Sequence, residues 1–160
     1  MLVVSDASPL NILVRISYVH VLPALCGQII IPPEVASEMS DPRAPVEVRN
    51  FIVSMPPWLA IKKPENLLSV GGLDPGERAA ISLAKEINAD LLLIDEKRGR
   101  RIATELRLPV MGTIGLLELA AGRGLLDLND VVQRIRRTDF SVSEAILKAA
   151  LQRDAQRKRQ

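Results

Sequence analysis

The sequence predicts a three-layer α/β/α fold with a mostly parallel central sheet, and two observations carry that prediction. Five short apolar runs, rich in branched residues and bounded by turn signals, are typical of buried strands: residues 2–5, 28–32, 58–62, 90–95 and 108–112. Helical patterns separate these runs, and the clearest, over residues 76–87, carries an apolar stripe of Ala80, Ile81, Leu83, Ala84 and Ile87. Alternating strands and helices imply right-handed crossovers, and therefore parallel strands with helices on both faces.

Chain length and hydropathy favour one domain. At 160 residues with 48% hydrophobic composition, the chain fits a single domain over 1–160, with a core over about 1–126 and a C-terminal helical extension over about 130–160. No apolar run approaches the roughly 20 residues that span a bilayer. The first residues also lack the pattern of a secretory signal. We therefore expect a cytoplasmic protein with no membrane partner.

The charge is unevenly distributed along the chain. The formal net charge is +2, but the segment from Arg134 to the end has eight Lys or Arg against three acids, a net of +5 that leaves −3 elsewhere. Such a basic tail is either a solvated helix end or a nucleic-acid contact, and we favour the solvated helix end. Aromatic residues make up only 2%, which argues against a platform that stacks successive bases. Any nucleic acid would be held mainly by its phosphates.

Two acids lie at the carboxyl ends of predicted strands. Asp6 ends the first strand and Asp95 ends the fourth, with Glu96 beside it as an adjacent substitute. Parallel sheets bind ligands at the carboxyl ends of their strands. Ser8, followed by Pro9, is the better candidate for the N-cap of the next helix. Asp6 is therefore not needed as a cap and is available for a catalytic or binding role. Two acids at strand ends indicate an acidic pocket.

Two further glutamates on helices are candidates for that pocket. Glu34 and Glu38 lie one turn apart on one helix face, and Glu34, in the first turn, is explained by the helix dipole. Glu38 has no such explanation. Glu77 follows Asp74 with the spacing of a capping box, so a structural role and a role in the pocket stay open for it.

Five segments in this order and spacing resemble the PIN-domain ribonucleases, in particular VapC-like proteins: SDASPL, PPEVASEM, LDPGERAAISLA, LLLIDEKRGRRIA and MGTIGLLELA. The resemblance covers residues 1 to about 126. It implies a carboxylate cluster that binds Mg²⁺ or Mn²⁺ and hydrolyses RNA, formed here by Asp6, Glu38, Glu77 and Asp95 with Thr113 as a polar helper. Glu77 departs from the family pattern, because many relatives have Asp there. The resemblance also implies a homodimer and, for a toxin, a small antitoxin protein as a partner.

The side chains available as ligands suit a hard metal ion. Divalent Mg²⁺ and Mn²⁺ prefer oxygen ligands, and the lone histidine, His20, excludes a site with several histidines. Carboxylates held close together repel one another until cations neutralise them. Thr113 has a second interpretation as the N-cap of the apolar helix that follows it. The apolar stretch over residues 115–126 offers either a dimer surface or core.

A basic segment follows Asp95 directly. Lys97, Arg98, Arg100 and Arg101 cannot all face one way on a helix, so some are surface charges and some are candidates for phosphate contacts. Two other functions remain open. A catalytically inactive PIN-like module would bind RNA or a protein partner. A phosphatase of the haloacid dehalogenase type would need an Asp where this chain has Ser8.

Overall fold

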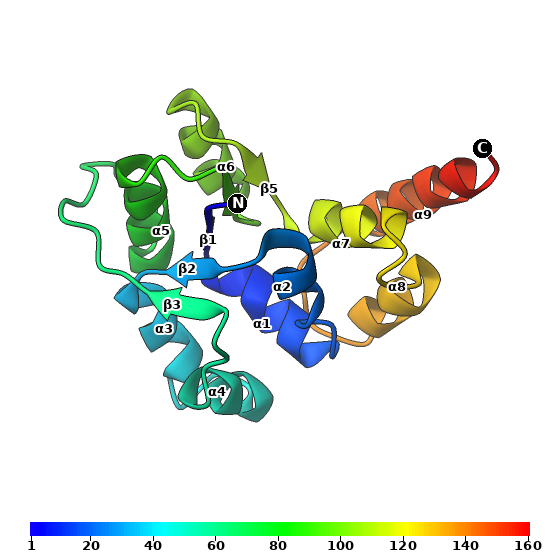
Figure 1. The fold of residues 1–160 in the computed structure, drawn as a ribbon, viewed down its shortest axis with the longest axis horizontal. Coiled ribbons are helices and arrows are strands. Elements are labelled where there is room, and N and C mark those ends of the chain that lie inside the picture. Colours follow the sequence, from blue (N-terminus) through cyan, green and yellow to red (C-terminus); the bar gives the residue numbers. More distant parts are fainter. The chain divides into compact units, whose positions relative to one another are not determined.

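A five-stranded parallel sheet forms the centre of residues 1–112. In the computed structural model, which describes residues 1–160, the strands lie in the order β3-β2-β1-β4-β5 and each neighbouring pair is parallel (Figure 1). Each predicted apolar run contains one of them: β1 (Val3–Ser5), β2 (Ile29–Ile31), β3 (Leu59–Ile61), β4 (Leu91–Leu93) and β5 (Val110–Met111). The predicted three-layer α/β/α fold with a parallel sheet is confirmed.

Helices cover both faces of the sheet. The chain moves from β1 outward to β2 and β3, then returns past β1 to β4 and β5. Because such crossovers are right-handed, the first connections lie on one face and the later ones on the other. Figure 1 shows this separation, with α1, α3 and α4 on one side of the strands and α5 and α6 on the other. The helices are α1 (Ala7–Arg15), α2 (Val21–Cys26), α3 (Pro33–Ser40), α4 (Val46–Val53), α5 (Pro75–Glu86) and α6 (Lys97–Glu105).

The apolar stripe predicted on α5 forms much of one core. Ala80, Ile81, Leu83 and Ala84 are fully buried, and they pack in one cluster with Val4 of β1, Leu92 of β4 and Ala103 of α6. Ile87 lies at the edge of the same cluster. Burying each of the larger of these side chains contributes about 1.5–3 kcal/mol, which fixes α5 against β1 and β4.

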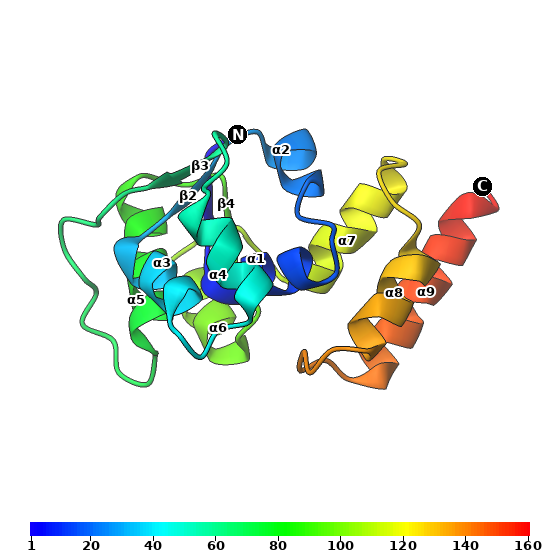
Figure 2. The ribbon, with the colours of Figure 1, turned by 90° about the horizontal axis from the view of Figure 1, so that it is seen from below.

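Residues 113–160 form a second compact unit. It contains α7 (Thr113–Gly122), α8 (Leu128–Arg136) and α9 (Glu144–Lys158). α8 and α9 lie side by side (Figure 2), and α7 packs against both. The unit therefore begins before the helical extension expected from about residue 130, because α7 shares a core with the later helices. The expectation of one domain over 1–160 stays a prediction. None of the helices has both the length and the apolar character needed to cross a bilayer.

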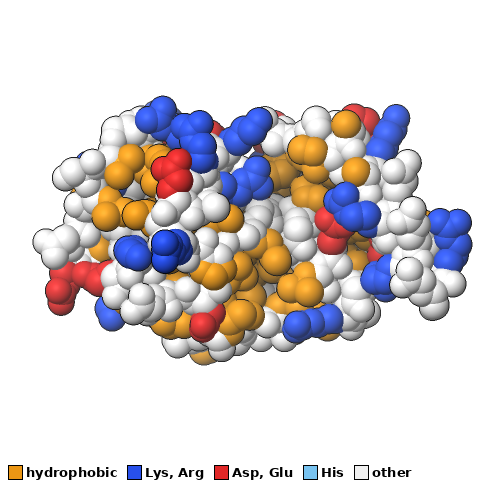
Figure 3. Space-filling view, turned by 90° about the horizontal axis from the view of Figure 1, so that it is seen from above, with side chains coloured by type: hydrophobic (Ala, Val, Ile, Leu, Met, Phe, Trp, Pro, Cys, Tyr) orange, Lys and Arg blue, Asp and Glu red, His pale blue; other side chains and the backbone are white.

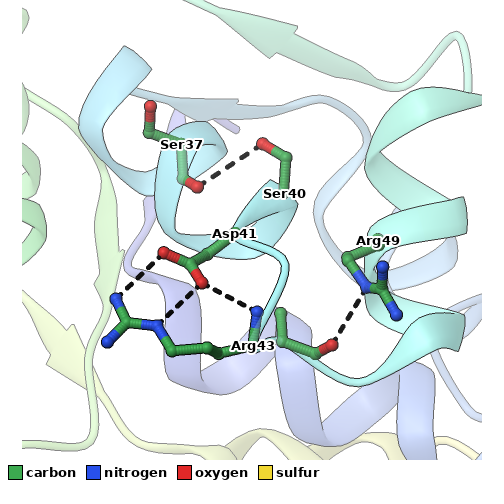
Figure 4. A network of polar contacts seen from close by, with 6 residues as sticks. Ser37, Ser40, Asp41, Arg43 and Arg49 are labelled. Carbon is green, nitrogen blue, oxygen red and sulfur yellow. Dashed lines mark hydrogen bonds and ion pairs between the residues drawn. The ribbon is translucent and has the colours of Figure 1, made fainter.

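A local network fixes the turn after α3 (Figure 4). Asp41 Oδ1 accepts hydrogen bonds from Arg43 N at 2.8 Å and Nε at 3.0 Å, and Arg49 Nε donates to the Ala44 carbonyl at 3.0 Å. The hydrogen bonds from Arg43 lower the pKa of Asp41 to about 2. This acid is therefore ionised and engaged in its own turn.

Candidate active site

The sheet reverses its winding direction between β1 and β4, which are neighbours although 88 residues separate their paired positions Val3 and Leu91. Asp6 follows β1 directly, and its amide donates to the Leu93 carbonyl at 2.9 Å. Asp95 lies two residues beyond β4. Open parallel sheets bind ligands at such a reversal, outside the carboxyl ends of the strands. Both acids lie where the sequence predicted them.

The cap predicted for the first helix is wrong. α1 begins at Ala7, so Asp6 and not Ser8 occupies the N-cap position. The Asp6 side chain nevertheless makes no capping hydrogen bond, and its Oδ1 is buried without a hydrogen-bond partner. The Ser8 hydroxyl donates instead to Asp95 Oδ2 at 2.8 Å. Asp6 is therefore a buried carboxylate, 6% exposed, with no structural role for one oxygen.

Three carboxylates converge on Gly76, in the first turn of α5. A β carbon at this position would lie 3.3 Å from Glu38 Oε2 and 3.5 Å from both Asp6 Oδ1 and Asp74 Oδ1. α3, which carries Glu38, packs against α5. Because glycine has no side chain, oxygens of these three residues line the position that a β carbon would occupy.

Glu77 lies beside this cluster with a capping role. Asp74 Oδ1 accepts a hydrogen bond from the Glu77 amide at 2.8 Å, and Glu77 Oε2 accepts one from the Asp74 amide at 3.3 Å. The capping box expected from the spacing is confirmed. The Glu77 side chain is also buried, at 8% exposure, and its charge contributes to the pKa of Asp6. Glu77 thus combines a capping role with a place next to the acidic cluster.

The environment of these carboxyl groups favours their neutral, protonated form over the charged form. Burial raises the pKa of Asp6 to about 7, and the charges of Asp74, Glu38 and Glu77 add to the effect. Burial, followed by the charge of Asp74, raises the pKa of Glu77 to about 7. Partial burial and the charge of Asp74 also raise the pKa of Glu38. Such shifts at one end of a sheet are typical of a functional site.

Asp95 lies against a different set of side chains. A β carbon at Gly112 would lie 3.1 Å from Asp95 Oδ1 and 3.0 Å from Arg100 Nη1, so both side chains reach the same point. Ser8 holds the other carboxylate oxygen. Asp95 is therefore oriented by Ser8 and has the Arg100 guanidinium near it, whereas Asp6 Oδ1 has no hydrogen-bond partner. Thr113 is buried and is the first residue of α7, in the second compact unit.

The basic residues of α6 point in several directions, as their helical spacing predicted. Arg98 Nη2 donates to the Gly71 carbonyl at 2.9 Å, and Arg100 lies near Asp95. Lys97 and Arg101 are exposed. In the second unit, basic side chains gather at the end of α9, at the right edge of Figure 3, where Arg157 and Lys158 pair with the buried carboxylate of Asp154. Part of the basic tail therefore has a structural role within α9.

A family model described as PIN domain matches residues 2–156. The chain belongs to the PIN-domain family. Among solved structures, it is similar to a PilT N-terminus domain protein from the hyperthermophilic archaeon Sulfolobus solfataricus P2, with a TM-score of 0.53 and 20% identity over 73% of this chain and 91% of that one. That likeness supports the fold. No curated protein matches this chain.

PIN domains are generally metal-dependent nucleases. Because the chain belongs to this family, it is not a phosphatase of the haloacid dehalogenase type. As the side chains stand, no three Asp, Glu, His or Cys residues form a group that could hold a metal ion. The donor set still fits a hard divalent cation. It consists of carboxylates, and the buried Asp6 Oδ1 has no other partner. The assignment of Asp6, Glu38, Glu77, Asp95 and Thr113 to catalysis stays a prediction.

Two side chains that contact the candidate residues are not indicated as site residues by the sequence. The spacing of Asp74 predicts only a helix cap, but its Oδ1 lies near the same point as oxygens of Asp6 and Glu38. Ser8 is predicted as a cap, but its hydroxyl donates a hydrogen bond to Asp95. The placement of Asp74 one turn before a candidate ligand on α5 is a signal that could have identified it. Ser8 gave no local signal, because its partner lies 87 residues away.

Proposed function

We propose that this PIN-domain protein is an endoribonuclease that hydrolyses RNA phosphodiester bonds with bound Mg²⁺ or Mn²⁺. The observation that carries the proposal is the buried Asp6 Oδ1, which has no hydrogen-bond partner and faces the carboxylates of Glu38 and Asp74 above Gly76. A cation is the partner that such a set of oxygens lacks. An uncompensated carboxylate at this depth would otherwise be costly.

Asp6, Glu38, Glu77 and Asp95 are the residues proposed to hold the metal, with Asp74 beside them. A divalent cation held by these residues would supply polarisation of the scissile phosphate and activation of the attacking water. Within the chain, Ser8 fixes the orientation of Asp95, and the Asp74–Glu77 capping box fixes the start of α5. Thr113 is proposed to orient the water or the phosphate.

RNA is the proposed polyanion because basic residues flank the acids. Lys97 and Arg101 are exposed on α6, and Arg100 lies next to Asp95. These side chains can neutralise phosphates near the proposed site without reading bases. With aromatic residues at only 2% of the chain, base stacking contributes little.

The resemblance to VapC-like proteins supports three finer proposals. The protein acts as the toxin of a toxin–antitoxin pair, a small antitoxin protein binds it, and the active form is a homodimer. The cheapest test of the first two is whether a small antitoxin gene lies immediately beside the gene for this chain. A neighbouring gene of that kind would also supply the partner for a binding assay.

Cleavage of single-stranded and structured RNA, with Mg²⁺, Mn²⁺ or EDTA, tests the proposed reaction. We expect cleavage with either metal, none in EDTA and none for Asp6→Asn. Asp41→Asn is the matched control, because Asp41 bonds only within its own turn, and it should cleave like the wild type. Undiminished cleavage in EDTA would contradict a metal mechanism. Binding of RNA without cleavage under any condition would favour the inactive PIN-like module.

A further inference from the structure

The segment between β3 and α5 leads directly into the acidic cluster. Residues 62–74 contain no helix or strand, and the segment ends at Asp74, the N-cap of α5. Its middle is held by α5, because Leu68 N donates to Ser82 Oγ at 2.9 Å and Arg78 Nε donates to the Leu68 carbonyl at 2.8 Å. The last part, before Asp74, is held from α6.

Arg98 of α6 makes that connection. Its Nη2 donates a hydrogen bond to the Gly71 carbonyl at 2.9 Å. A β carbon on Gly72 would lie 2.5 Å from Nη2 and 2.7 Å from Nε, so the guanidinium fills the space that any side chain at this position would need. Gly72 also has a φ of +82°, a backbone conformation that favours glycine. The turn and the arginine therefore fit each other.

We propose that Arg98 is a positioning residue for the acidic cluster and not a phosphate contact. By holding the turn at Gly71 and Gly72, it fixes where the chain enters α5. That entry places Asp74 and Gly76 next to the carboxylates of Asp6 and Glu38. This inference rests on the proposed function of the cluster. It changes the expectation that Arg98, like its neighbours, binds RNA.

The chemistry of the contact requires arginine. A hydrogen bond from a charged donor to a carbonyl is stronger than one between neutral groups, and the planar guanidinium can lie against a glycine while its edge donates. A lysine at this position keeps the charge but presents one compact ammonium group. Arg101, three residues later on α6, is exposed and makes no hydrogen bond to the 62–74 segment, so it is the matched control.

The test compares Arg98→Gln, Arg98→Lys and Arg101→Gln. In EDTA, hydrogen exchange of peptides over residues 68–78 should be faster in both Arg98 variants, including at the capped Glu77 amide, and unchanged in Arg101→Gln. The increase in melting temperature on adding Mn²⁺ should be smaller for Arg98→Gln. With RNA, kcat should fall about 10- to 100-fold while KM and the salt slope of binding stay near wild type. Arg101→Gln should reduce that slope by about one.

Gly72→Ala provides a second variant that keeps every charge. Its new methyl group displaces the guanidinium, so it should reproduce the faster exchange and the weaker Mn²⁺ response of Arg98→Gln. Gly71→Ala is its control, because a β carbon there meets nothing within 4 Å. Circular dichroism of each variant establishes that it is folded.

Two results would overturn the proposal. An Arg98→Gln variant with normal exchange and a salt slope lower by one would make Arg98 a phosphate contact. Faster exchange with an unchanged Mn²⁺ response would limit Arg98 to stabilising the loop. If the wild type does not cleave RNA with Mn²⁺, the proposed function fails, and the exchange and melting experiments still decide the role of Arg98.

Discussion

The Ser8 hydroxyl donates a 2.8 Å hydrogen bond to Asp95 Oδ2, joining two residues 87 positions apart in the sequence. Ser8 lies in the first turn of α1, immediately after β1, and Asp95 follows β4. The acid at the end of one central strand is therefore oriented from the end of the other. Asp6, two residues before Ser8, has an oxygen with no such partner.

Replacing Ser8 with Ala should release Asp95 without removing its charge. The variant should lose about 1 kcal/mol of folding free energy, the usual net value of one hydrogen bond, as measured by urea unfolding in EDTA. Cleavage of RNA should fall because Asp95 is no longer oriented. The exposed Ser37 provides the control, since Ser37→Ala should stay within about 0.5 kcal/mol of wild type.

Asp95→Asn separates a metal ligand from a structural acid. An asparagine keeps an oxygen that can accept the Ser8 hydrogen bond, so the protein in EDTA should be about as stable as wild type. Mn²⁺ binds only the folded site, and the increase in melting temperature that it causes should be much smaller than in wild type. RNA cleavage should be lost. A destabilised variant that responds fully to Mn²⁺ would remove Asp95 from the proposed site.

Gly76→Ala should block the acidic cluster without unfolding the protein. The added methyl group would lie 3.3–3.5 Å from oxygens of Glu38, Asp6 and Asp74, in the space that a cation would need. Alanine is also the better helix former, by up to about 1 kcal/mol. The melting temperature in EDTA should therefore stay near wild type or rise, while the Mn²⁺ response and cleavage fall. A full Mn²⁺ response would place the cation elsewhere.

The raised pKa values predict a pH-dependent stability in EDTA. The pKa of Asp6 and that of Glu77 are about 7 in the folded protein, against ordinary values of 3.8 and 4.5. Between pH of about 4 and 7 the folded protein binds more protons than the unfolded chain, so these groups stabilise it at low pH and this contribution falls as the pH rises to 7. The urea midpoint of wild type relative to Asp6→Asn should therefore be higher at pH 5 than at pH 8. Parallel pH profiles for the two proteins would contradict a raised pKa at Asp6.

The homodimer is testable by light scattering at micromolar concentration, where the mass should be twice the chain mass of 17.5 kDa. Within the apolar stretch over residues 115–126, Leu116, Leu117, Ala120 and Ala121 are buried, whereas Leu125 is exposed. The four buried residues fit the interpretation of this stretch as core, so it gives the dimer little support. A monomer would contradict the assembly that the family resemblance implies.

Local patterns in the sequence determined the elements of this fold. The five apolar runs became the five strands, the stripe on α5 became core, and Asp74 with Glu77 formed the expected capping box. Each of these features depends on residues within a few positions of one another. Asp6 and Asp95 were located at strand ends for the same reason, since a strand and the residue after it are both visible in a short window.

Only the tertiary structure decided which side chains meet. The strand order sets β1 beside β4, and that pairing brings Ser8 to Asp95. The packing of α3 against α5 brings Glu38 to the space above Gly76, and the packing around α6 brings Arg98 to Gly71. Arg98 and Gly71 are 27 residues apart in the sequence, and Ser8 and Asp95 are 87 residues apart. Their meeting depends on how whole elements bury their apolar faces, which no local pattern of polar residues encodes.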